Sequence, residues 1–199
     1  MVGCWGTALA QIAYYHELQA VGELAYTCSN GYDIQENLSA HHFDFSAFAA
    51  QIDSTSSKKT VDELARYNYY AAAILQKDFG TGGYMNLLAP ASLIETHYPV
   101  RAKRYVSFRQ SFPYRSAKLE KVIVNELNAN RPLFLHFANL NDFGHSVVID
   151  AYCYDAKGFK IHINNGQGGE GDGWYAFEKG ILRADDTKLR VIYTVAPKE

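Results

Sequence analysis

The segment GHSVVID, residues 144–150, places a histidine at the start of an apolar, β-branched run. Such a run predicts a buried strand, with Val147–Ile149 inside His145–Tyr154. Another apolar run, Arg131–Phe137, comes shortly before it, and the connection Asn139–Gly144 predicts that the two strands form a hairpin-like pair. His145 would then lie at the start of the second strand, where an imidazole can act as a proton acceptor.

A third strand is predicted over Gly158–Ile163, and it leads into Asn164, Asn165 and the glycine-rich run Gly166–Gly169. An asparagine at the end of a strand next to the histidine strand can accept the imidazole N–H and hold the ring in one orientation. Asn164 is the best candidate for this role. The alternative for both asparagines is ordinary turn chemistry before a glycine.

The other end of the chain begins with VGCWGTA, residues 2–8, followed by apolar residues at helical spacing. This spacing predicts a helix whose first turn carries Cys4. Unpaired N–H groups and the positive end of the helix dipole favour an anion there, and a nearby imidazolium stabilises a thiolate further. Cys4 is therefore a candidate nucleophile with His145 as its base, with the two reacting atoms within roughly 4 Å of each other. The alternative is a small buried cysteine without chemistry.

The middle of the chain predicts secondary structure elements and no catalytic residues. Thr60–Phe79 is expected to be a long helix with Thr60 as its N-cap, and Gly22–Ser39 is expected to be a loop. Two more helices are predicted over Ser92–Tyr98 and Lys118–Asn130.

These motifs, in this order, resemble the streptopain family of papain-like cysteine peptidases. The resemblance rests on Val2–His16, on Gly144–Asp150 and on the stretch from His162 to Tyr175 with its glycines. It implies one α+β, papain-like domain over residues 1–199. In that fold an N-terminal nucleophile helix packs on a largely antiparallel sheet that carries the base.

The resemblance also implies a cysteine endopeptidase that hydrolyses peptide bonds. It makes Cys4 the nucleophile, His145 the proton shuttle and Asn164 the residue that orients the ring. We expect Gly144, Asn165 and Gly166 to contribute to substrate binding. The substrate would be a protein or peptide, with an apolar side chain preferred near the cut. No cofactor is expected.

Two departures from the family matter. Family members carry a glutamine upstream of the cysteine that donates to the oxyanion, whereas only Met1, Val2 and Gly3 precede Cys4 here. The loss of one such donor costs roughly two to three orders of magnitude in rate. We therefore expect a missing N-terminal segment, or a removed propeptide. The glycine-rich loop has Asn165 and Gln167 where the family has tryptophans.

Composition and residue spacing argue against several other classes of protein. The formal net charge of −2 over 199 residues, without a basic cluster beyond Arg101–Arg104, argues against nucleic-acid binding. No apolar run predicts a membrane span, and no signal peptide is visible. The histidines and the three cysteines lack zinc-like spacing, so no metal site is expected. Secretion, and a virulence role as protease or toxin, are expected from the resemblance alone.

Other functions stay open. The same thiol chemistry serves amidases, deamidases and acyl transferases, in which a side-chain amide or an amine replaces the peptide or the water. A chain that lacks the upstream oxyanion donor could also be a non-catalytic binding module with the same fold.

Overall fold

The computed structural model describes residues 1–49, 52–86, 88–109 and 116–198. The chain forms two compact units. The first is Met1–Val100 together with the C-terminal residues from Pro197 onward, and the second is Arg101–Ala196. The single domain predicted over residues 1–199 stays a prediction.

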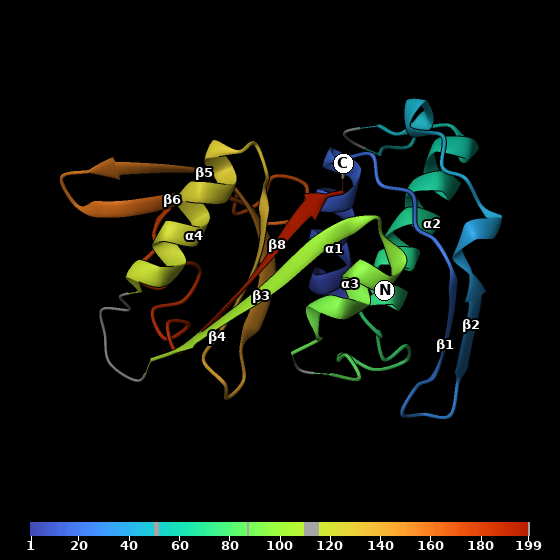
Figure 1. The fold of residues 1–199 in the computed structure, drawn as a ribbon, viewed down its shortest axis with the longest axis horizontal. Coiled ribbons are helices and arrows are strands. Elements are labelled where there is room, and N and C mark those ends of the chain that lie inside the picture. Colours follow the sequence, from blue (N-terminus) through green and yellow to red (C-terminus); the bar gives the residue numbers. More distant parts are fainter. Residues whose placement is uncertain (50–51, 87, 110–115, 199) are drawn as a thin grey trace. The chain divides into compact units, whose positions relative to one another are not determined.

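The first unit is built around two helices that pack side by side, α1 (Gly3–Tyr15) and α2 (Lys58–Ile74) (Figure 1). The contact is close because Gly6 has no side chain: a Cβ there would lie 2.7 Å from the Cβ of Ala72. The predicted helix after Cys4 is therefore confirmed. The shorter elements of this unit are α3 (Ala91–His97) and the 3-10 turns η1 (Leu38–Ala40) and η2 (Phe45–Ala47).

Two predictions for the first unit were wrong. The expected loop Gly22–Ser39 contains an antiparallel hairpin of β1 (Glu23–Thr27) and β2 (Asp33–Asn37). Each strand buries a single residue, Leu24 in β1 and Ile34 in β2, so the apolar pattern is too sparse to predict them.

The limits of the long helix also differ from the prediction. Helix α2 begins at Lys58 because the side chain of Ser57 accepts a hydrogen bond from Thr60 N, so Ser57 and not Thr60 is the N-cap. It ends at Ile74, shortly before Gln76 takes a left-handed backbone conformation with φ of 56°.

The second unit is a six-stranded sheet with the strand order β3-β8-β4-β5-β6-β7 and one helix, α4 (Ala117–Asn128). The described registers of β8–β4, β4–β5, β5–β6 and β6–β7 are antiparallel. The mixture of helices and antiparallel sheet and the three predicted strands are confirmed. The bounds are β3 (Val100–Phe108), β4 (Leu133–Ala138), β5 (Gly144–Asp155), β6 (Gly158–Asn164), β7 (Gly173–Ala176) and β8 (Leu189–Pro197).

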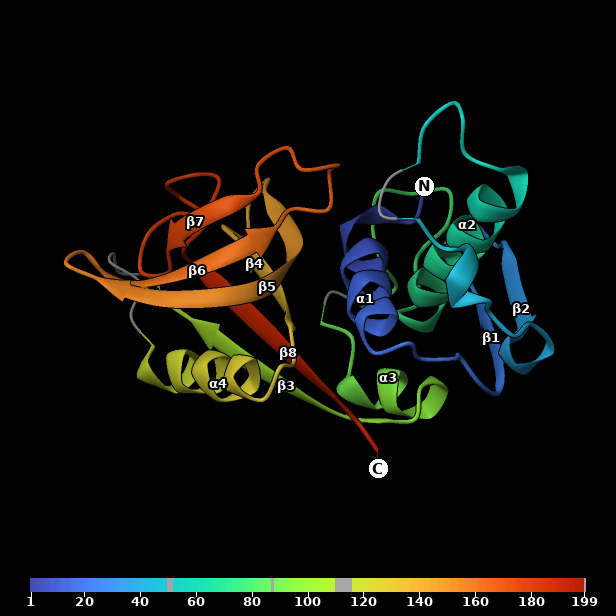
Figure 2. The same ribbon diagram turned by 90° about the horizontal axis from the view of Figure 1, so that it is seen from above.

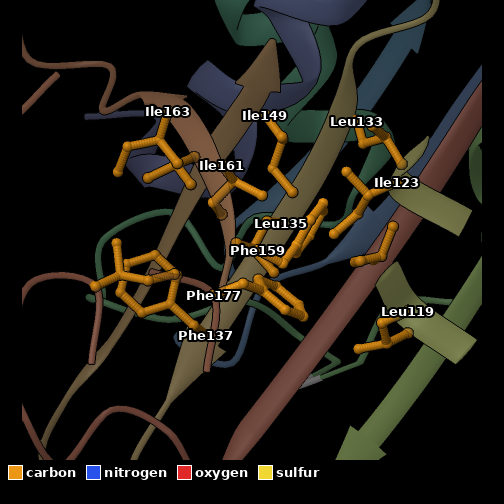
Figure 3. Packing of buried hydrophobic residues seen from close by; sticks show 13 residues of the cluster. Leu119, Ile123, Leu133, Leu135, Phe137, Ile149, Phe159, Ile161, Ile163 and Phe177 are labelled. Carbon is orange, nitrogen blue, oxygen red and sulfur yellow. The ribbon is translucent and has the colours of Figure 1, made fainter. Parts of the chain in front are cut away.

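Helix α4 covers one face of this sheet (Figure 2). Its residues Leu119 and Ile123 pack against aliphatic and aromatic side chains from the strands (Figure 3). Because side chains alternate along a strand, every second residue of β4 and β6 points into this core, as do Val147 and Ile149 of β5 before its register shift. The strand and loop members of the buried cluster are Leu133, Leu135, Phe137, Val147, Ile149, Phe159, Ile161, Ile163, Phe177, Ile181 and Ile192.

Candidate active site

Cys4 is the second residue of α1, and its thiol is partly exposed. It therefore lies in the first helical turn, where backbone N–H groups lack intrahelical partners and favour a negative charge. Gly3 has φ of +74°, a left-handed conformation that a residue with a Cβ rarely adopts. The glycine before the cysteine is thus required by the backbone itself.

The hydroxyl of Tyr84 is inserted into this first turn. It donates to Val2 O at 2.7 Å and accepts from Gly6 N at 2.8 Å. In a regular helix Gly6 N would donate directly to Val2 O, four residues earlier. Burial raises the pKa of Tyr84, so the hydroxyl stays protonated and can keep both bonds. The turn that carries Cys4 is consequently opened and fixed by Tyr84.

His145 is the second residue of β5 and lies opposite Phe137 of β4. Its Nε2 is 3.0 Å from the side-chain oxygen of Asn165 and 3.3 Å from the backbone oxygen of the same residue. Both oxygens are acceptors, so Nε2 carries the proton. In the neutral ring Nδ1 is then the nitrogen that can take a proton from a thiol.

Asn165 is itself held on several sides. Its backbone N–H donates to the Asp172 carboxylate at 2.6 Å, and its side-chain NH₂ donates to Glu170 O at 2.8 Å. The second bond fixes the orientation of the amide, because it uses the nitrogen and leaves the oxygen directed to His145. Gly171 makes room for this side chain: a Cβ there would lie 2.8 Å from Asn165 Nδ2.

The position of Asn164 at the end of the strand predicts that it orients the ring, but the contact with His145 comes from Asn165. The reason is the alternation of the strand. Ile161 and Ile163 are buried in the core that His145 also faces, so Asn165 continues on that side while Asn164 points to the other. The side chain of Asn164 accepts from Gly166 N at 2.9 Å and so shapes the turn. Counting residues from Ile161 would have indicated Asn165.

Gly144, expected to bind substrate, has a packing role in the structure. A Cβ at this position would lie 3.1 Å from Cε1 of His136, so a larger residue would require that ring to shift by a few tenths of an ångström. The preceding turn is fixed by Asn139, whose side-chain oxygen accepts from the backbone N–H groups of residues 141, 142 and 143. The backbone that leads into His145 is therefore rigidly connected to β4.

A second histidine, His136, is buried on β4, and its Nδ1 is 3.0 Å from the hydroxyl of Ser146. Burial lowers the pKa of His136 to about 4, and the charges of His145 and Arg190 act in the same direction, whereas a backbone hydrogen bond with His145 raises it. His136 is neutral above that pH. Above that pH it therefore adds no positive charge beside His145.

No group of three or more histidine, cysteine or acidic residues in the described ranges is arranged to hold a metal ion. Helices in the same ranges are all too short or too polar to cross a bilayer.

Comparison with known proteins gives the following relationships. The model of the peptidase C10 family matches residues 1–175. Among solved structures, the chain is similar to active wild-type interpain A, a cysteine protease of Prevotella intermedia, with 19% identity and a TM-score of 0.73 over 96% of this chain and 82% of that chain. It is also similar to a mutant fragment of prointerpain A from the same organism, with 17% identity and a TM-score of 0.71 over 96% and 62%. No curated protein sequence matches.

Proposed function

Because the chain belongs to the peptidase C10 family and is a cysteine peptidase, we propose that it cleaves peptide bonds through Cys4 and His145, with Asn165 orienting the ring. The family assignment covers the cysteine turn, the histidine strand and the asparagine loop. The observation that carries the assignment of roles is the pair of Asn165 oxygens at His145 Nε2. This arrangement supports Nδ1 as the base.

In the proposed reaction the Cys4 thiol gives its proton to His145 Nδ1, and the sulfur attacks the peptide carbonyl carbon. The carbonyl oxygen becomes an oxyanion, for which the backbone N–H of Cys4 is one donor. The C–N bond then breaks, and the leaving amine takes the proton from His145. Water adds to the thioester after giving a proton to His145, and the acid product leaves as the thiol is restored.

The two compact units would act together as one peptidase domain, because the first carries Cys4 and the second carries His145 and Asn165. We further propose a protein or peptide substrate with an apolar side chain near the cut, and secretion of the enzyme. Similarity to a pro-form fragment supports a propeptide as a partner.

The test is selective alkylation followed by an activity assay. At pH 6, iodoacetamide should label Cys4 much faster than the buried Cys28 or the partly exposed Cys153. The preference should become much smaller in His145→Ala, and Cys4→Ala should lose all hydrolysis of apolar peptides. Cys153→Ala serves as the matched control and should keep full activity.

Equal labelling of the three cysteines, or hydrolysis that persists in Cys4→Ala after controls for contaminants, would contradict the proposed roles. A reactive Cys4 without hydrolysis of any peptide would instead favour an acyl acceptor other than water.

A further inference from the structure

Lys77 is a buried lysine next to the cysteine turn, and the mechanism above does not use it. Only 3% of the residue is exposed. It follows α2 in sequence, and its backbone pairs with that of Tyr84, the residue inserted into the first turn of α1. The ammonium lies over the Tyr84 ring, 5.1 Å from its centroid. Lysine is rarely buried to this degree without a specific reason.

The ammonium is held in place by the turn that follows it. Nζ donates to Asp78 O at 3.3 Å, to Thr81 O at 2.9 Å and to Gly83 O. Three carbonyl acceptors match the three N–H groups of the charged form, whereas a neutral amine has only two. The geometry therefore favours a fixed positive charge.

The neighbouring carboxylate is engaged elsewhere. Asp78 accepts from Ser29 N at 2.8 Å, from the Ser29 hydroxyl at 2.6 Å and from the Thr81 hydroxyl at 3.0 Å. All the described hydrogen bonds of the Lys77 ammonium go instead to neutral backbone oxygens. A buried cation held in this way is only partly compensated and attracts an anion nearby.

Cys4 is within the electrostatic reach of this cation. A Cβ on Gly3, the residue before Cys4, would lie 3.8 Å from Lys77 Cε and 3.3 Å from the Tyr84 hydroxyl. Burial lowers the pKa of Lys77, while Asp78, Cys4 and Cys28 act on it in the opposite direction. The interaction of two charges is mutual. If a Cys4 thiolate stabilises the Lys77 ammonium, the ammonium stabilises the thiolate to the same extent.

We propose that Lys77 is an electrostatic positioning residue that stabilises the Cys4 thiolate from within the first unit, independently of His145. The groups that face the two partners are Tyr84 beside both, and Asp78 and Cys28 beside Lys77. Tyr84 stays neutral, so it fixes the positions of its neighbours without adding a charge. The catalytic consequence rests on the proposed function, whereas the effect on the thiol does not.

The experiment measures the rate of iodoacetamide alkylation of Cys4 against pH in the full chain, with the labelled peptide followed by mass spectrometry. Lys77→Met, which removes the charge and keeps an apolar chain, should raise the midpoint by about one pH unit. Lys77→Arg should stay near the wild-type midpoint. Lys77→Gln, which is neutral and keeps two N–H donors for the carbonyls, should shift the midpoint as Lys77→Met does.

The matched control is Lys58→Met, the same substitution at the exposed start of α2, where Lys58 pairs with Asp62. Solvent and salt screen that charge, so the midpoint should not move. Repeating Lys77→Met in a His145→Ala background separates this inference from the proposed function, because the shift should persist there even if the chain hydrolyses no peptide.

An unchanged midpoint in folded Lys77→Gln, judged by circular dichroism, would overturn the inference. So would a shift that disappears when His145 is absent, because Lys77 would then act through the histidine. If Lys77→Met unfolds, Lys77→Gln and Lys77→Arg still decide the question.

Discussion

Asn165 concentrates several interactions in one side chain, because its oxygen faces His145 Nε2 while its nitrogen is bound to Glu170 O. Replacement by alanine would remove this side-chain acceptor of Nε2 and keep the backbone oxygen at 3.3 Å. We expect Asn165→Ala to lower kcat by roughly tenfold to a hundredfold with KM little changed, since orientation and not substrate contact is lost.

Asn164→Ala is the matched comparison, since Asn164 is adjacent and its oxygen bonds to Gly166 N. We expect a smaller effect on kcat, together with a loss of stability from the weakened turn. Steady-state kinetics of the two variants, with thermal unfolding as the second measurement, decides between them. A larger loss of kcat in Asn164→Ala would return the orienting role to the residue that the sequence first indicated.

The sequence predicts those residues of the site that a local pattern marks, and it does not predict those that only long-range contacts bring together. Cys4 and His145 were found because each stands at the start of an apolar element with strong periodicity. The choice between Asn164 and Asn165 needed the face of β6, which the buried Ile161 and Ile163 define. Tyr84 and Lys77 were not identified as neighbours of the cysteine, because their contacts cross about eighty positions of sequence and follow no local pattern.

At the level of secondary structure elements, the position of Cys4 depends on the packing of α1 against α2. Gly6 and Ala72 are the point of closest approach, where a Cβ on residue 6 would lie 2.7 Å from the Ala72 Cβ. We expect Gly6→Ala to lower the free energy of unfolding by about 1–3 kcal/mol through overpacking, despite the better helix propensity of alanine. Chemical denaturation of the variant measures this loss.

Ala72→Gly provides the control, because it removes the methyl group that the new side chain would meet. The double variant Gly6→Ala/Ala72→Gly should lose less stability than the sum of the two single variants, which is the signature of a shared contact. Strictly additive losses would show that the two residues do not meet.

Other elements show why local patterns predict some structures and miss others. The strands β4, β5 and β6 carry dense apolar residues, and each was predicted. The hairpin of β1 and β2 was missed because its polar residues outnumber the buried Leu24 and Ile34. The antiparallel pairing of its two strands, which a local pattern does not show, defines it instead. The start of α2 was misplaced by three residues because Ser57 and Thr60 are both acceptable caps, and only the bond to Thr60 N distinguishes them.

For the whole molecule, the proposed function requires that residues from both compact units react with one substrate. Cys4 belongs to the unit that contains α1 and α2, and His145 to the unit of the six-stranded sheet. A thiol and an imidazole that share a proton can be bridged by a short bifunctional alkylating reagent such as 1,3-dibromoacetone. The reagent first alkylates the thiolate, and its second bromide is then displaced by a ring nitrogen if that nitrogen is close.

We expect this reagent to give one major product in the native chain, a Cys4 peptide joined to a His145 peptide, identified by mass spectrometry after proteolysis. Prior treatment with iodoacetamide should prevent it, and His145→Ala should leave Cys4 modified only once. His162→Ala is the matched control, since that histidine is paired with Asp150 at 2.6 Å and should not affect the yield. A bridge from Cys4 to a different residue, or single modification of Cys4 in the native chain, would show that the two units do not form the proposed site.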